Sequence, residues 1–138
     1  MASIRSRIGA KMKDRYLFKA KRIKDGQWVE GAFYIEPYTD CCYIIQWNSS
    51  GLGFNEFIKV DGDTICQCTG LKDKNDKLIW ENDILNGGNL VVTWREELAS
   101  YCLTKKGWMY QHFFGEAVDA CDCEVIGNVF DNPELMHA

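Results

Sequence analysis

The 138-residue sequence has no long hydrophobic run and contains only two prolines. No apolar segment approaches the roughly 18 residues that a membrane-spanning helix needs, so we expect no membrane span. The basic start of the chain lacks the apolar core and the cleavage pattern of a signal peptide, so we expect a cytoplasmic protein. Because 46% of the residues are hydrophobic, the composition is that of a folded chain rather than a disordered one.

The motifs of common enzyme classes are also missing. The glycines form neither a Walker loop nor a dinucleotide-binding fingerprint, and no serine lies in a nucleophile elbow. His112 lies between Tyr110 and Phe114 at strand spacing, which favours a packed side chain over a general base. We therefore predict a protein without enzymatic activity, with no catalytic residue and no cofactor.

Seven cysteines are present, and without a secretion signal we predict that they are reduced thiols. They are Cys41, Cys42, Cys66, Cys68, Cys102, Cys121 and Cys123. The pairs Cys66 with Cys68 and Cys121 with Cys123 are separated by a single residue, whereas the paired ligands of structural zinc usually have two or more residues between them. Since a cysteine thiol is commonly buried, we predict packed thiols and no metal ligand.

The acidic turns are also poor candidates for a cation site. Residues 73–77 begin like a calcium-binding loop, but Lys77 occupies the fifth position and Ile84 the twelfth, where oxygen ligands are needed. We interpret residues 73–77 as a solvated turn and Asp61-Gly62-Asp63 as a tight turn between strands.

Positive charge is concentrated at the start of the chain. Residues 1–24 contain nine basic residues and one acidic residue, a net charge of +8, whereas the remainder contains seven basic and nineteen acidic residues, a net charge of −12. Such a segment can bind the phosphates of a nucleic acid, or the acidic body of its own chain or of a neighbouring subunit. The candidate nucleic-acid-binding residues are Arg15, Lys19, Lys21, Arg22 and Lys24. The five tryptophans offer stacking platforms in that case, although we favour core positions for them.

Short segments of alternating or β-branched residues, separated by turn signals, predict an all-β chain. The predicted strands are residues 16–21, 28–36, 42–47, 57–60, 64–69, 77–80, 83–85, 90–94, 100–103, 108–114 and 124–130, with one helical turn at 116–121. Asp25-Gly26 predicts a hairpin between the first two strands. We expect a basic arm over residues 1–14, a β subdomain over 15–63, and a second β subdomain over 64–138 that packs intimately against the first. The closely spaced strands of the second subdomain favour a small barrel or sandwich.

Two segments carry a resemblance to a known family. The sequence TGLKDKNDKLIWENDIL at residues 69–85, followed by Val-Val-Thr-Trp, and EVIGNVFDNPEL at residues 124–135 resemble the YopX family of phage and prophage proteins. Residues 16–31 are similar to the opening strand pair of that family. The resemblance implies an SH3-like barrel in the C-terminal half and supplies no established biochemical activity. Asp76 and Asn82 stand where the family usually has glycine, and both residue types tolerate left-handed backbone angles, so we expect these turns to be kept.

Two functions are compatible with the sequence. The first is a non-enzymatic phage or prophage accessory protein that acts through contacts with phage or host proteins in the bacterial cytoplasm. We expect such a protein to be a homo-oligomer in which exposed strand edges pair between subunits. The alternative is a small nucleic-acid-binding β-barrel that uses the basic N-terminal region.

Overall fold

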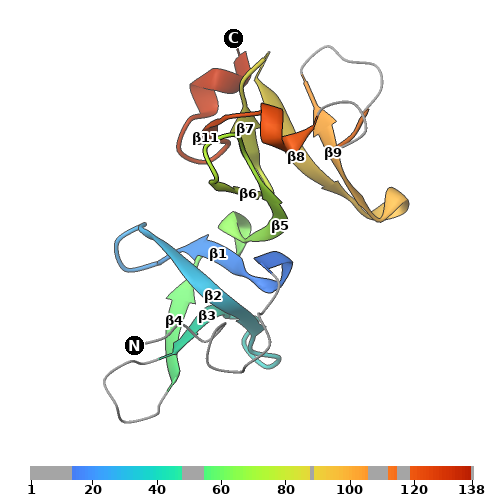
Figure 1. Cartoon of the computed structure of the whole chain (residues 1–138). Helices are drawn as coiled ribbons and strands as arrows, with labels where there is room; N and C mark the ends of the chain where they lie inside the picture. Colours follow the sequence, from blue (N-terminus) through green and yellow to red (C-terminus); the bar gives the residue numbers. More distant parts are fainter. Residues whose placement is uncertain (1–13, 48–54, 88, 106–111, 115–118, 138) are drawn as a thin grey trace. The chain divides into compact units, whose positions relative to one another are not determined.

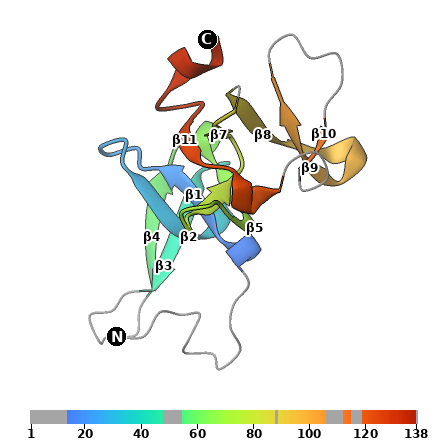
Figure 2. The ribbon, with the colours of Figure 1, turned by 45° about the horizontal axis from the view of Figure 1, so that its top comes forward.

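Antiparallel strands make up most of the computed structural model, which describes residues 14–47, 55–87, 89–105, 112–114 and 119–137. The chain divides into two units, residues 1–68 and 69–138 (Figures 1 and 2). Over the described residues the helical segments are short 3-10 helices, and none of them is long or apolar enough to cross a membrane. The prediction of an all-β chain is confirmed.

The first unit is built around four strands that follow one another in space as they do in sequence. They are β1 (Phe18–Lys21), β2 (Trp28–Ile35), β3 (Cys42–Trp47) and β4 (Asn55–Val60), with the 3-10 helices η1 (Asp14–Tyr16) and η2 (Gly62–Thr64). β4 forms the edge of this sheet, and β5 (Cys66–Lys72) pairs with β1 on the opposite side. The predicted hairpin between β1 and β2 is confirmed: Gly26 takes a φ of +72°, and Arg22 N–H donates to the carbonyl of Gln27 at 2.8 Å.

The core of the first unit lies on one side of this sheet. Ala20, Ile44 and Val60 are its buried residues, and the rings of Phe18 and Phe33 pack against them with their centroids 5.6 Å apart. Gly31 lies where β2 meets β3 most closely, because a Cβ atom there would stand 2.3 Å from the carbonyl oxygen of Ile45. A larger residue would therefore force the two strands apart.

The second unit begins inside β5, whose later residues lie beside β6. Its elements are β6 (Leu78–Trp80), β7 (Asp83–Leu85), β8 (Leu90–Arg95), η3 (Glu96–Leu98), β9 (Ser100–Thr104), β10 (His112–Phe113), η4 (Ala120–Asp122), β11 (Val125–Asn128) and η5 (Pro133–His137). The order of the second sheet is β10-β9-β8-β7-β11. Its buried core consists of Ile79, Leu85, Leu90, Val92, Leu103 and Cys123.

Most of the predicted strands are present, with shifted ends. The predicted strand at 64–69 starts late, because residues 62–64 form η2, and it then continues to Lys72. β10 contains two residues of the predicted strand 108–114, and η4 overlaps the predicted helical turn at 116–121; residues 106–111 and 115–118 lie outside the described part of the chain. The predicted boundary after residue 63 falls at η2, whereas the units divide after Cys68, within β5. Among the described residues, the pairings of the named strands close no barrel, and an isolated antiparallel bridge between Arg22 and Val60 joins the residue after β1 to the end of β4.

Two turns use the left-handed backbone angles that the sequence predicts. Asp76 has a φ of +65° and Asn82 a φ of +71°. Both lie in the tight connections on either side of β6. The expectation that these residues replace glycine without loss of the turn is therefore confirmed.

Candidate binding face of the first unit

Over β2 to β4, the side of the first sheet opposite its core is largely exposed, whereas on β5 the same side is buried, since Cys66, which pairs with Lys19, is 1% exposed. Directly paired residues of antiparallel strands share a face, and alternate residues along each strand return to that face. The register pairs Tyr34 with Tyr43 and Tyr43 with Lys59, and it pairs Lys21 with Trp28. We call this surface the open face; its residues are Lys19, Lys21, Trp28, Glu30, Ala32, Tyr34, Tyr43, Ile45, Phe57 and Lys59.

Three aromatic rings lie together on the open face. The Tyr34 ring centroid is 6.3 Å from that of Tyr43 and 6.1 Å from that of Phe57, and the Tyr43 and Phe57 centroids are 6.3 Å apart. Phe57 meets both tyrosines edge to face, the arrangement that the quadrupoles of aromatic rings prefer. Tyr34 is 40% exposed and Phe57 is 55% exposed, so this aromatic cluster presents a large apolar surface to solvent.

Two lysines lie over a fourth ring at the other end of the open face. The Nζ atom of Lys19 is 4.8 Å from the centroid of the Trp28 ring, and that of Lys21 is 5.4 Å away. Both distances are within the range of a cation–π interaction, which holds the ammonium groups close to the indole. Trp28 is half-buried by this arrangement.

The structure separates the five basic residues predicted to bind nucleic acid. Lys19 and Lys21 are on the open face, whereas Arg22 and Lys24 lie in the turn after β1, where Arg22 forms an ion pair with Asp25. The Arg15 side chain lies against its neighbour Tyr16, to whose hydroxyl it donates a hydrogen bond of 2.9 Å. The predicted set is therefore distributed over three places in the first unit.

Sequence reasoning missed the other residues of the open face. β2 carries aromatic residues on both of its sides, Trp28 and Tyr34 on one and Phe33 on the other, so alternation did not reveal which side faces the core. Register and packing decide it in the structure. The wider prediction that the tryptophans fill the core is confirmed for Trp80, which is 5% exposed, and wrong for Trp94, which is 40% exposed.

The acidic residues of the segment 69–85 have a structural role. Asp73 is 5% exposed, and its carboxylate accepts hydrogen bonds from the backbone N–H groups of Asn75 and Lys77, both at 2.9 Å, and of Val125 at 3.0 Å. Burial alone would raise the pKa of Asp73, but these three N–H groups outweigh burial and hold the pKa below its ordinary value. The prediction of a solvated turn is wrong for Asp73, because its carboxylate joins this turn to β11.

Asp83 has a similar role at the next turn. It is 2% exposed, and its Oδ2 atom accepts a hydrogen bond of 2.8 Å from the backbone N–H of Trp80. The carboxylate thus bridges the short connection from β6 to β7. Both buried aspartates thus fix the turns of this segment through hydrogen bonds to backbone N–H groups.

The cysteines are reduced thiols with mostly buried positions. Cys66, Cys68, Cys102 and Cys123 are buried, and Cys121 is exposed. The Sγ atom of Cys123 lies 3.4 Å from the carbonyl oxygen of Asp119, to which it donates. Burial, and after it the neighbouring Asp122 carboxylate, raises the pKa of the Cys123 thiol, which disfavours the thiolate that a metal would require. In the described part of the chain, no three cysteine, histidine or acidic side chains are grouped to hold a metal ion.

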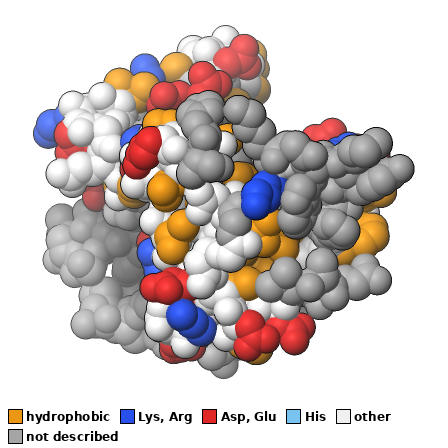
Figure 3. Space-filling model, turned by 90° about the horizontal axis from the view of Figure 1, so that it is seen from above, with side chains coloured by type: hydrophobic (Ala, Val, Ile, Leu, Met, Phe, Trp, Pro, Cys, Tyr) orange, Lys and Arg blue, Asp and Glu red, His pale blue; other side chains and the backbone are white. Residues whose placement is uncertain are grey.

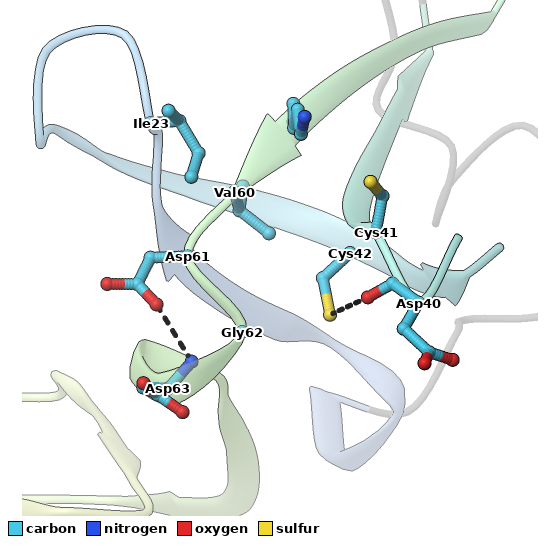
Figure 4. A pocket seen from close by; sticks show the side chains of 9 residues that line it. Ile23, Asp40, Cys41, Cys42, Val60, Asp61, Gly62 and Asp63 are labelled. Atoms are coloured by element: carbon cyan, nitrogen blue, oxygen red, sulfur yellow. Dashed lines mark hydrogen bonds between the residues drawn. The ribbon is translucent and has the colours of Figure 1, made fainter.

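An open pocket of about 500 Å³ lies in the first unit beside η2 (Figure 4). Its lining includes Asp40, Cys42, Asp61 and Asp63. The Asp61 carboxylate accepts the backbone N–H of Asp63 at 3.0 Å, which confirms the predicted tight turn, and the Cys42 thiol lies 3.8 Å from the carbonyl oxygen of Asp40. Both contacts join residues that line the pocket.

Charged side chains are mixed elsewhere on the molecule. On the face drawn in Figure 3, the lysine and arginine side chains of the described residues lie apart from one another. The described residues of that face therefore form no concentrated basic patch. The open face of the first sheet is the stronger candidate for a binding surface, because it combines lysines with exposed aromatic rings.

These features define a small all-β protein with two units and an open aromatic sheet face. The chain belongs to the YopX family: the family model described as YopX protein matches residues 17–137, nearly the whole chain. None of the curated proteins matches it. The resemblance given by the segments at 69–85 and 124–135 is thus confirmed.

Proposed function

We propose that this chain is a non-enzymatic accessory protein of a phage or prophage that acts through protein contacts in the bacterial cytoplasm. We propose also that it self-associates. Membership of the YopX family, together with the phage and prophage origin that the resemblance implies, supports the first part. The edge strand β4 supports the second.

The outer side of β4 is occupied at its C-terminal end, where Val60 forms an antiparallel bridge with Arg22 and the carbonyl oxygen of Lys59 accepts a hydrogen bond of 3.2 Å from Ile23 N–H, so the backbone of Lys59 points away from β3. The N-terminal part of β4 is the part suited to strand pairing. Because backbone groups alternate in direction along a strand, those of Phe57 and Asn55 point the same way. An edge of this kind is a template for a strand of another chain.

The side chains of β4 favour a second copy of the same chain as the partner. Phe57 is more than half exposed at the edge, and an antiparallel pairing of β4 with β4 of another copy would bring the two Phe57 rings together across a two-fold axis. The two aromatic clusters would then become neighbours. Such a contact removes apolar surface from water, which is the main favourable contribution to association.

The molar mass in solution tests this proposal. Light scattering during size-exclusion chromatography is expected to give a multiple of 15.9 kDa for the natural chain. Phe57→Lys is expected to lower that mass, because it puts a charge at the paired edge. Tyr38→Ala is the matched control, since Tyr38 is a 95% exposed aromatic residue in the turn between β2 and β3. A monomeric natural chain at every concentration, or an unchanged mass in Phe57→Lys, would contradict self-association.

For the second unit we propose an SH3-like barrel. The family resemblance supports this fold, as does the antiparallel meander β7-β8-β9-β10 with β11 on the other side of β7. An experimental structure in which this sheet has another strand order would contradict it.

A further inference from the structure

We infer that the open face of the first sheet binds single-stranded nucleic acid, with bases stacked on the aromatic cluster and phosphates at Lys19, Lys21 and Lys59. This inference goes beyond the proposed function and does not rest on it. Self-association uses the backbone edge of β4 and the Phe57 ring, whereas the variants that test this binding change Lys19, Lys21 and Tyr34 on β1 and β2.

The charge of the open face selects an anionic ligand. It carries three lysines and one acidic residue, Glu30, although the whole chain has a net charge of −4. A polyanion that lies along β1 and β2 would therefore meet a net positive charge on this face.

The aromatic rings make a nucleic acid a better fit than an anion without bases. Tyr34 in the inner strand β2 and Phe57 in the edge strand β4 are exposed beside each other. Base stacking on such rings tolerates any nucleotide sequence. Trp28 and Tyr34 are six residues apart on β2, which is about 20 Å along the strand. Lysines flank this span at both ends, Lys19 and Lys21 beside Trp28 and Lys59 beside Tyr43. Phosphate contacts can thus alternate with stacked bases along the face.

Binding can be measured by the fluorescence anisotropy of labelled oligo-dT and oligo-U of about 15 nucleotides, a length near the upper site size of small β-barrel domains. The expected result is binding that weakens about 16-fold between 50 and 200 mM salt, because three phosphate contacts on a single strand give a log–log slope of about −2. Binding of either oligonucleotide supports the inference, and a preference for one of them identifies DNA or RNA as the ligand. No binding to either at 50 mM salt would overturn it.

Two variants separate the roles of the lysines and the rings. Lys19→Gln combined with Lys21→Gln is expected to reduce the salt slope by about 1.4, since two phosphate contacts are lost. Tyr34→Ala is expected to weaken binding at least about fivefold while the salt slope stays the same, because it removes a stacking surface.

Matched controls lie outside the open face. Lys74→Gln combined with Lys77→Gln removes the same charge from the second unit, and Tyr38→Ala removes an exposed ring from a turn. If these controls weaken binding as much as the open-face variants do, the inference is wrong. The inference is also wrong if two results occur together: Tyr34→Ala binds the oligonucleotides as tightly as the natural chain does, and the natural chain binds heparin, a polyanion without bases, as tightly as it binds the oligonucleotides. That outcome assigns the face to acidic polymers, including acidic proteins.

Thermal unfolding of each variant checks that it is folded, and light scattering checks its molar mass. The open-face variants are expected to keep the mass of the natural chain, because Lys19, Lys21 and Tyr34 lie away from the edge strand. Failure of nucleic-acid binding is thereby distinguished from failure of self-association.

Discussion

The two units of this protein differ in how they use polar and apolar residues. Residues 1–68 contain ten basic and eight acidic residues, whereas residues 69–138 contain six basic and twelve acidic residues. The first unit leaves one side of its sheet open, with lysines and aromatic rings exposed there. The second unit buries two aspartates to fix the turns around β6. The first unit is therefore built to present a surface, and the second to hold short strands together.

Adjacent residues of β3 give the strongest test of the open face. Ile44 is fully buried in the core of the first unit, whereas Ile45 points to the open face. Ile44→Ala is expected to lower the free energy of unfolding by about 2–5 kcal/mol, because it removes buried apolar groups and leaves a cavity. Ile45→Ala is expected to cost less than about 1 kcal/mol. Urea unfolding measures both, and equal losses would mean that both sides of this sheet are packed.

The buried carboxylate of Asp73 gives the next largest effect, in the second unit. Asp73→Ala is expected to lower the free energy of unfolding by about 2–3 kcal/mol, because three backbone N–H groups lose a charged acceptor. Lys74→Ala is the control, since that side chain is half-exposed in the same turn. A loss below about 0.5 kcal/mol for Asp73→Ala would show that this bridge to β11 is dispensable.

The stability contributed by Asp73 depends on pH. Its pKa in the folded chain is below the ordinary value of about 4, so the folded state favours the ionised form. This contribution is fully present above about pH 4 and is lost as the pH falls through the lowered pKa. Asp73→Asn is therefore expected to lose less stability than the natural chain when urea unfolding at pH 3 is compared with pH 7.

The left-handed turn residue gives the smallest effect. Asp76→Ala is expected to cost about 1 kcal/mol, because alanine tolerates the φ of +65° less well than aspartate does. Asp76→Asn keeps that tolerance and removes the charge that pairs with Lys72 at 3.5 Å. Thermal unfolding of the two variants separates backbone strain from the exposed ion pair. If both variants melt alike, the backbone angle is not what selects this residue.

Local sequence patterns predicted local structure well. The Asp25-Gly26 turn, the strands 28–35 and 42–47, and the left-handed positions of Asp76 and Asn82 were all readable, because each depends on a few neighbouring residues. Strand ends were less predictable where a cap competes, as at residues 62–64, whose 3-10 helix delays β5. The strand preference of a single residue, Thr64, therefore did not predict that the 3-10 helix would form there.

The candidate binding face was predicted only in part. Lys19 and Lys21 were among the candidates, but Tyr34, Tyr43, Phe57 and Lys59 were not. These residues come from three strands, β2, β3 and β4, so their proximity depends on the register between segments that are separated in the sequence. Periodicity within a single strand contains no such information.

The sequence by itself determined the all-β character, the turn positions and membership of the YopX family, because these follow from local patterns and short segments. Only the tertiary structure decided that Asp73 is buried, since its third hydrogen bond comes from Val125, which is 52 residues away. Only the tertiary structure decided which side of the first sheet is open. Both outcomes depend on contacts between distant segments, and those contacts arise only when the chain is folded.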